Sequence, residues 1–359
     1  MRIRKQRFWW LLIGAVVLLL VAAVATSVLW YNGQLQPVDP SDDQTLRVDI
    51  KQGMSASAVA ETLEGRGAIR SALAMNIYLR LHGGSGGFRA GVYSVSPSQS
   101  LEEIITHLSS GTSDEISVTF YPGAMLQRAD KTSSGAKYDV YTALKTAGFS
   151  DQEITQALSA TYQSSVFVGR PAGAGLEGYI FGDTYFVETG ASAQQVLQRA
   201  IDEFARVVTE NDLERKFAAR GLTLYEGITL ASIVERESIG CPGQATCEDQ
   251  RRIASVFYNR LDIGMMLGSD VTYHYAADKT GVQRNYQLDS EYNTRIHTGL
   301  PPGPIAVPGL SALNAVADPA QTDYLYFLSG DDDVTYFGTT EAEHTANIRN
   351  HCQQKCLLP

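Results

Sequence analysis

TLYEGITLASIVERES, residues 223–238, is the stretch that decides how the second half of this chain folds. Thr223 with a glutamate three residues later is the pattern of a capping box, which predicts the start of a helix. Residues 228–234 are apolar nearly all round that helix, and a helix of this kind is buried inside a domain. It then reaches two carboxylates, Glu235 and Glu237. The sequence therefore predicts a buried helix with acidic side chains at its end.

A carboxyl group at the end of a buried helix is desolvated, and its pKa rises. Such a group holds a proton near neutral pH and can donate it to a leaving oxygen. The alternative is that Glu235 and Glu237 face solvent and pair with Arg251 or Arg252. Their i, i+2 spacing points them to different faces of the helix, so they are not expected to form a carboxylate pair on one side of a substrate.

The N-terminus carries the second strong signal. Residues 8–31 contain no charged side chain, and a run of this length can span the roughly 30 Å hydrocarbon core of a bilayer as a helix. Four basic residues precede it, which favours a cytoplasmic N-terminus. We expect a retained single-pass anchor, with the remaining chain outside the cytoplasm. A cleaved signal peptide is the alternative, because small residues occur near the end of the run.

Composition narrows the class of protein. The chain has 359 residues, 44% of them hydrophobic, and a formal net charge of −10. That length allows two or more domains. The acidic balance argues against nucleic acid as a partner and against electrostatic binding to anionic lipid.

Four cysteines form two close pairs, Cys241 with Cys247 and Cys352 with Cys356. Disulfides persist outside the cytoplasm, so these neighbours are the simplest pairing, although three connectivities exist. A zinc site using the second pair and His351 is the alternative.

Periodicity divides the chain into segments. The boundaries we predict are a tail over 1–7, an anchor over 8–31, a linker over 32–44, a small α+β module over 45–112, a connecting segment over 113–175 and a larger domain over 176–359. The module reads as two strand–helix units. Residues 264–308 are rich in Gly, Pro, Asn and Tyr, and such irregular stretches are often functional loops.

Several stretches, taken in order, resemble one family. Residues 230–238, LASIVERES, resemble the signature of the MltG (YceG-like) endolytic murein transglycosylases. Further agreement lies in residues 176–185, in the helix over 252–261, around Ser269-Asp270, in the block 292–309 and in the closing segment around 324–344. Together they cover about 176–350, and the anchor with a LysM-like module at 45–112 fits the family's architecture.

The resemblance implies an enzyme that cleaves the MurNAc–GlcNAc bond inside nascent peptidoglycan strands and leaves 1,6-anhydro-MurNAc ends. It implies Glu235 as the catalytic residue, acting first as acid and then as base while the sugar's own C6 hydroxyl attacks. No cofactor or metal is then needed. The expected substrate-binding residues are Glu237, Ser269, Asp270, Thr272, Tyr275, Tyr292, Asn293 and Thr294.

The resemblance also implies an α+β fold throughout and a role in ending glycan elongation, with peptidoglycan synthases as partners. In the LysM-like module, the Gly83–Gly87 loop and Tyr93 are expected near a glycan-contacting surface. Four departures from the family pattern occur: Gly182 replaces a usual Pro, Pro122 replaces a usual acidic residue, Gly268 and Val271 replace the Gln and Pro that usually flank the Ser-Asp pair, and 239–248 resembles an insertion. A catalytically silent peptidoglycan-binding scaffold and a muramidase using water are the alternative functions.

Overall fold

The computed structural model describes residues 2–82, 87–110, 114–130, 139–238, 241 and 243–357, with side chains from Gly14 to Cys356. Helices and strands are mixed, as the predicted α+β class requires. The chain forms two compact units. Unit 1 comprises Met1–Ile116 with Val187–Gly190, and unit 2 comprises Ser117–Phe186 with Ala191–Pro359.

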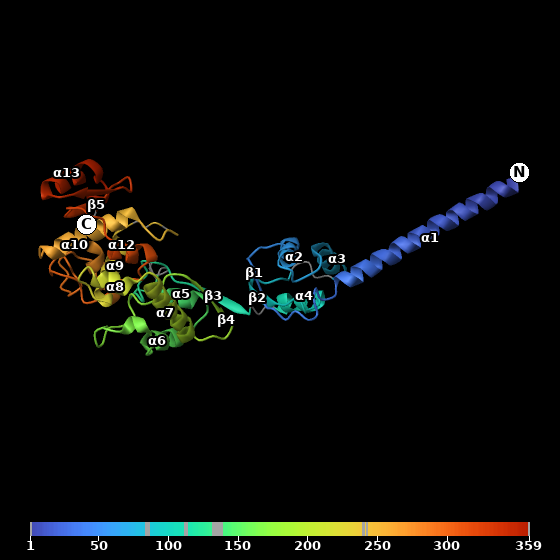
Figure 1. Cartoon of the computed structure of the whole chain (residues 1–359), viewed down its shortest axis with the longest axis horizontal. Helices are drawn as coiled ribbons and strands as arrows, with labels where there is room; N and C mark the ends of the chain where they lie inside the picture. The colour runs from blue at the N-terminus through green and yellow to red at the C-terminus, as the bar shows by residue number, and fades with distance from the viewer. Residues whose placement is uncertain are drawn as a thin grey trace. The chain divides into compact units, whose positions relative to one another are not determined.

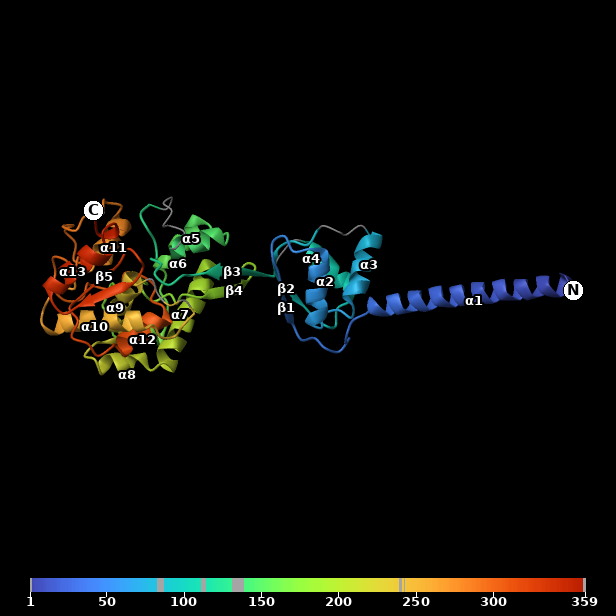
Figure 2. The ribbon, with the colours of Figure 1, turned by 90° about the horizontal axis from the view of Figure 1, so that it is seen from above.

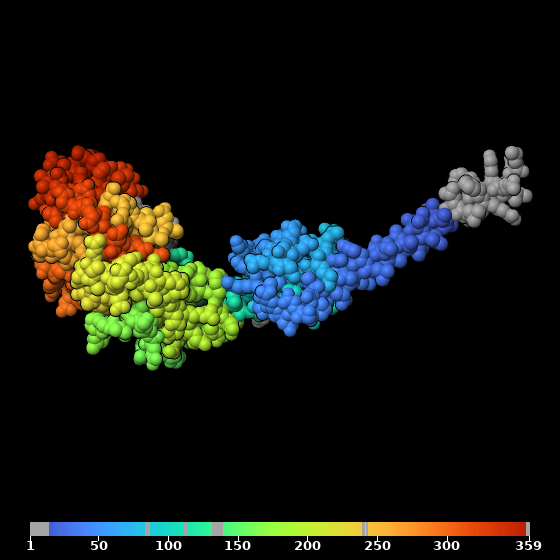
Figure 3. Space-filling model, in the orientation of Figure 1, coloured from blue at the N-terminus to red at the C-terminus, as the bar shows by residue number. Residues whose placement is uncertain are grey.

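Unit 1 begins with one long helix, α1 (Arg2–Gln34). Its stretch Gly14–Gln34 has a mean hydropathy of 2.2 and none of its most apolar window is buried, so by length and composition it can cross a membrane. The residues from Gly14 to Trp30 are exposed (Figure 3). The residues that follow are bound to the module, because the Leu101 amide donates to Leu35 O and Arg70 donates to Pro37 O.

The module of unit 1 consists of β1 (Leu46–Ile50), α2 (Ala56–Gly65), α3 (Ala72–His82), β2 (Gly91–Val95) and α4 (Leu101–Ser110). β1 and β2 pair antiparallel, and the helices bury one apolar face each in a shared core. The two predicted strand–helix units are present, but α3 was not predicted.

Tyr93 does not lie at the surface of this module, so that expectation is wrong. Its side chain is fully buried in the core, and its hydroxyl donates to Arg89 O. In a strand that pairs on both edges, alternate residues face the core, and Tyr93 occupies an inward position. Of the glycine loop, residues 83–86 lie outside the described residues.

The chain passes between the units in two strands, β3 (Glu115–Thr119) and β4 (Thr184–Glu188). The hydrogen-bonded strand order is β1-β2-β3-β4. Most of the predicted connecting segment 113–175 belongs to unit 2, where it supplies α5 (Val140–Thr146), α6 (Asp151–Ser159) and η2 (Ser165–Phe167). The predicted domain boundaries stay predictions.

Unit 2 is built around α9 (Leu224–Glu237), the helix that the capping box predicts. It packs against α8 (Leu213–Ala218), α10 (Glu248–Asp262), α11 (Asp270–Thr280) and α12 (Leu310–Ala317) (Figures 1 and 2). Every residue from Gly227 to Val234 is buried, and α7 (Ala193–Glu210) lies on α8. The predicted burial of the helix is therefore confirmed.

The C-terminal part of unit 2 is a hairpin covered by a helix. β5 (Tyr326–Ser329) and β6 (Thr335–Gly338) pair antiparallel, and α13 (Glu341–His351) packs on both, followed by η3 (Lys355–Leu357) (Figure 2). Disulfides join Cys241 to Cys247 and Cys352 to Cys356, which agrees with the simplest predicted pairing.

Residues 264–308 are not irregular throughout, since α11 occupies Asp270–Thr280. Its sequence, DVTYHYAADKT, lacks a one-sided apolar stripe, and its valine, threonine and tyrosines favour strands in isolation. Burial of Tyr273, Tyr275 and the two alanines against unit 2 overrides that preference, and Gly281 ends the helix with a positive φ.

The contact between α9 and α8 yields a stability prediction. A Cβ at Gly227 would lie 2.2 Å from Phe217 Cδ2, and both residues are in the core. Overpacking costs about 1–3 kcal/mol, more than the roughly 1 kcal/mol that alanine gains over glycine in a helix. We expect Gly227→Ala to lower the free energy of unfolding in urea. Gly175→Ala, where a Cβ meets no atom within 4 Å, is the control; equal stability of the two variants would contradict the close packing.

Candidate active site

The C-terminal turn of α9 places three consecutive ionisable side chains at the edge of the buried helix. Glu235, Arg236 and Glu237 are each half-buried, directly after residues that are fully buried. Because successive helical positions point in different directions, each meets a different part of unit 2. The three side chains therefore lie in three different environments around the end of α9.

Glu235 faces the N-terminus of α12. Its Oε2 accepts a hydrogen bond from the Gly309 amide at 3.0 Å, and Gly309 is the N-cap of α12. Desolvation raises the pKa of Glu235, while the Gly309 amide and the Gln250 side chain act in the opposite direction. The Glu235 carboxyl therefore holds its proton more firmly than a glutamate in water does, and the Gly309 amide is in place to donate to the carboxylate form.

Two of the sequence departures meet beside Glu235. A Cβ at Gly182 would lie 2.8 Å from Pro122 Cδ, and a Cβ at Gly309 would lie 3.3 Å from Pro122 Cβ and 2.9 Å from Glu235 Oε2. The Pro122 ring therefore fills the space between two glycines. Glycine at position 182 is compatible with proline at position 122 because it leaves that space open.

Glu237 lies in a different place. Its Oε1 accepts a hydrogen bond from Ser269 Oγ. Desolvation raises the pKa of Glu237 to about 7, opposed by the Ser269 hydrogen bond and assisted by Asp270. Glu237 lines a cavity of about 550 Å³ together with residues of the α11 start, the β5 strand and α13. Among the residues that the structure describes, Glu235 and Glu237 share no hydrogen-bond partner, in agreement with their predicted divergence.

The cavity beside Glu237 carries both charges and rings. Asp270 pairs with Arg295, and both line it. Arg260 lies 5.3 Å from the Tyr326 ring centroid, and Tyr326 stacks on His344. Of the predicted substrate-binding residues, the structure brings Glu237, Ser269 and Asp270 together here.

Three other predicted residues support the loop that carries Ser269. Thr272 and Thr294 hydroxyls lie 3.0 Å apart, and Thr294 Oγ1 accepts from the Ser269 amide. The Asn293 amide group donates to Tyr286 O and Leu288 O. All three side chains are at most 1% exposed. Substrate contact by these residues stays a prediction.

Tyr275 and Tyr292 belong to a separate cluster around Glu177. Tyr275 donates to Glu177 Oε2 at 3.2 Å and accepts from Lys279 Nζ at 2.8 Å, and its ring lies 4.9 Å from that of Tyr292. Glu177 Oε1 accepts from the Leu126 amide. Desolvation raises the pKa of Glu177 to about 7. Sequence reasoning did not single out Glu177, since one glutamate before a glycine and a tyrosine carries no periodic signal.

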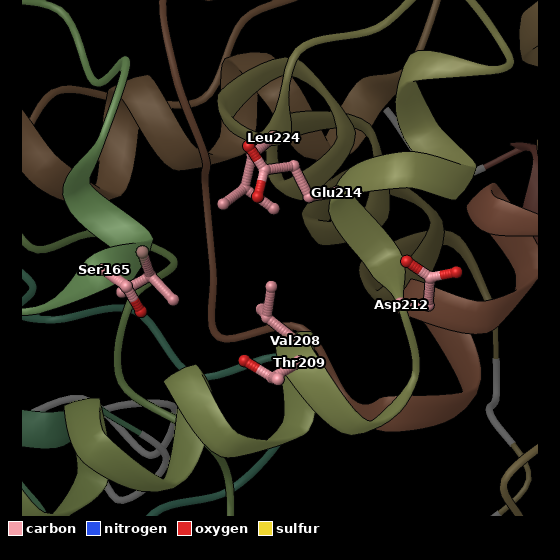
Figure 4. A pocket seen from close by; sticks show the side chains of 7 residues that line it. Ser165, Val208, Thr209, Asp212, Glu214 and Leu224 are labelled. Carbon is pink, nitrogen blue, oxygen red and sulfur yellow. The ribbon is translucent and has the colours of Figure 1, made fainter.

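Other cavities lie away from these residues. Figure 4 shows one of about 240 Å³ between η2, α7 and α8, lined by Ser165, Val208, Thr209, Asp212, Glu214 and the first residue of α9, Leu224. A second, of about 650 Å³, lies between Tyr225 and Tyr258 and includes Pro301 and Pro302. None of the predicted site residues lines either. Within the described ranges, no group of His, Cys, Asp or Glu is arranged to hold a metal ion.

The raised pKa of Glu237 predicts a pH dependence of stability. In the unfolded chain a glutamate titrates near 4.5, whereas folded Glu237 titrates at about 7. Folded Glu237 binds more protons between these values, so the stabilisation that it contributes is present below pH 4.5 and is lost as pH rises through about 7, by at most about 3 kcal/mol.

We expect Glu237→Gln to reduce this decline, measured as unfolding free energies in urea at pH 4.5 and pH 8. Glu341→Gln, at an exposed position lining the same cavity, is the matched control and should leave the decline nearly as in the native chain. A decline of the same size in Glu237→Gln would show that this carboxyl is not responsible.

Comparison with known proteins gives consistent similarities. A model of the YceG-like family matches residues 48–350. A protein of Bacillus subtilis (strain 168) named endolytic murein transglycosylase is 33% identical over 345 residues, covering 92% of each chain. One of the same name from Streptococcus pneumoniae (strain D39) is 29% identical, and the match covers 89% of this chain but 61% of that protein.

A solved structure agrees in fold. The crystal structure of a putative YceG-like protein from Listeria monocytogenes superposes with a TM-score of 0.55 at 24% identity. The match covers 84% of this chain and 98% of that one.

Proposed function

The chain belongs to the YceG-like family, and we propose that it is a membrane-anchored endolytic murein transglycosylase in which Glu235 is the single acid and base. The observation that carries this proposal is the position of Glu235 at the end of a buried helix, with its pKa raised by desolvation and its Oε2 bound by the Gly309 amide. Relatives named endolytic murein transglycosylase support the substrate and the reaction.

The proposed reaction uses both protonation states of Glu235. As an acid, it donates its proton to the glycosidic oxygen between MurNAc and GlcNAc, and the C1–O bond breaks. As a carboxylate, it then accepts the proton of the C6 hydroxyl of MurNAc, whose oxygen bonds to C1. A 1,6-anhydro end results, and Glu235 is again an acid. No water is consumed, so the two-carboxylate arrangement of hydrolytic glycosidases is not required.

The environment of Glu235 fits both steps. Desolvation favours the protonated form that donates. The Gly309 amide donates to the carboxylate that remains, and the N-terminus of α12 also favours negative charge there. Glu237, Ser269 and Asp270 would bind saccharide beside the reacting bond. They line one cavity, and Glu237 follows Glu235 by only two residues on α9.

The anchor would place this reaction near the membrane. We propose that residues 8–31 span the bilayer with the N-terminus in the cytoplasm, because Arg2, Arg4, Lys5 and Arg7 precede them. A cut made inside new strands at this position would end their elongation, next to the peptidoglycan synthases. The module of unit 1 would act as a LysM-like glycan-binding element.

Two other functions remain distinguishable by experiment. A silent scaffold would bind murein and release nothing. A muramidase would use water, and its products would be one water heavier than anhydro-muropeptides. Mass spectrometry of muropeptides released from purified sacculi therefore separates all three.

The central test replaces Glu235. The full-length Glu235→Gln variant in detergent should release no anhydro-muropeptides, because the amide keeps the shape but cannot transfer a proton, and acid–base catalysis contributes about 10²–10⁴-fold. Glu237→Gln should lose much less. Circular dichroism checks that both variants fold, and native-like release by a folded Glu235→Gln would refute the assignment.

A second test concerns the module. Residues 35–116 include its whole hydrophobic core and the chain bound to it by Arg70. This fragment should sediment with purified sacculi, and soluble glycan strands should compete with that binding. If it stays in the supernatant although it is folded, the module is a spacer.

A further inference from the structure

Arg236 is, among the described residues, the ionisable side chain at the end of α9 for which no hydrogen-bond partner is found. Among the described residues, no atom accepts a hydrogen bond from its guanidinium, and its Nη1 is buried. Glu235 and Glu237, on either side of it, both accept hydrogen bonds. A half-buried guanidinium offers five N–H donors in a planar fork, and burying such a charge without a partner is unfavourable.

The groups that face Arg236 leave an excess of positive charge. Arg128 and Arg284 both pair with Asp278, at 2.6 and 2.8 Å, so one carboxylate already serves two arginines. Burial lowers the pKa of Arg236, the charge of Arg128 lowers it further, and Asp278 acts in the opposite direction. The nearby Glu177 is itself held by the Leu126 amide and Tyr275. The two carboxyl groups that act on Arg236, Asp278 and Glu177, are therefore both engaged by other groups, and among the described residues neither accepts a hydrogen bond from it.

This cluster adjoins the reacting carboxyl. Arg236 follows Glu235 directly, with Cα atoms about 3.8 Å apart. Arg128 also lies on the segment that begins with Pro122, whose ring lies beside Gly309 at Glu235. Six residues of extended chain span about 20 Å at most. A ligand bound in the cluster would therefore lie within a few sugar lengths of Glu235.

We propose that Arg236, with Arg128 and Arg284 beside it, binds a carboxylate of the peptide that murein carries on its MurNAc residues. This inference rests on the proposed function, which supplies murein as the substrate. A guanidinium matches a carboxylate in a bidentate, charge-assisted geometry. The peptide projects from the sugar next to the cleaved bond, so its acidic groups come close to the catalytic helix.

The pyrophosphate of a lipid-linked strand is the other anion that a nascent glycan offers. It sits at the strand's end, whereas an endolytic cut lies inside the strand, so the peptide carboxylate is the anion that recurs at each cut. Arg236 is then a specificity determinant, and its role is to recognise strands that bear peptides.

The test measures binding separately from cleavage. Full-length Glu235→Gln protein in detergent is titrated with soluble glycan strands that keep their peptides and with strands from which an amidase has removed them. We expect the peptide-bearing strands to bind roughly tenfold more tightly, the size of one charge-assisted hydrogen-bonded contact. Adding Arg236→Gln should abolish most of this ratio, and Arg236→Lys should retain part of it. Arg206→Gln, at an exposed arginine of α7, is the matched control and should keep the ratio.

Thermal unfolding supplies the readout that a structural role would change. An unpaired, half-buried charge does not stabilise the fold. The Arg236→Gln variant should therefore have a midpoint of thermal unfolding equal to that of the unsubstituted protein or above it. A large drop in that temperature would show that Arg236 holds the structure, and would overturn the proposal.

The remaining outcomes are equally decisive. Equal binding of both strand types, or a ratio unaffected by Arg236→Gln, would overturn the proposal. With lipid-linked strands that lack peptides as a third ligand, binding that depends on Arg236 would do the same. Because binding is measured in an inactive variant, failure of the proposed cleavage would appear separately, as absence of anhydro-muropeptides from the native enzyme.

Discussion

The segment that ends at Gly309 lies along α9, and the hydrogen bonds between the two fix the geometry of the candidate site. Tyr225 donates to Pro302 O, the Ile305 amide donates to the Ser232 hydroxyl, and the Gly309 amide donates to Glu235. A Cβ at Gly303 would lie 2.2 Å from the Tyr225 hydroxyl, so the segment approaches this closely only because glycine stands there. The carboxyl of Glu235 is positioned by the packing of a loop on a buried helix.

The same packing controls the protonation of Glu235. Burial of the helix end removes water from the carboxyl and raises its pKa, while the amide of Gly309 offsets part of that effect. A group used as both acid and base needs this balance, because a carboxyl without the donor would hold its proton too firmly, and one in water would lose it. Arg236 shows the opposite situation, a charge desolvated by the same helix end without a partner among the described residues.

Much of the fold could be predicted because its signals are local. The capping box at Thr223, the apolar run over 228–234 and the uncharged run over 8–31 each depend on neighbouring residues, and each gives the helix that it predicts. α3, α8, α12 and the hairpin strand β6 were not predicted, since their patterns are short. The stretch that contains α11 was expected to be irregular because it is rich in Gly, Pro, Asn and Tyr, and tertiary burial makes part of it a helix.

The sequence by itself determined the buried helix, the two carboxylates at its end, their divergence and the apolar N-terminal helix, because each follows from periodicity or from the spacing of adjacent residues. Only the tertiary structure decided which groups meet those carboxylates. The Gly309 amide, the Pro122 ring between two glycines, the partners of Glu177 and the isolation of Arg236 bring together residues tens of positions apart or more. Such contacts depend on how the chain packs in three dimensions, and no local pattern encodes them.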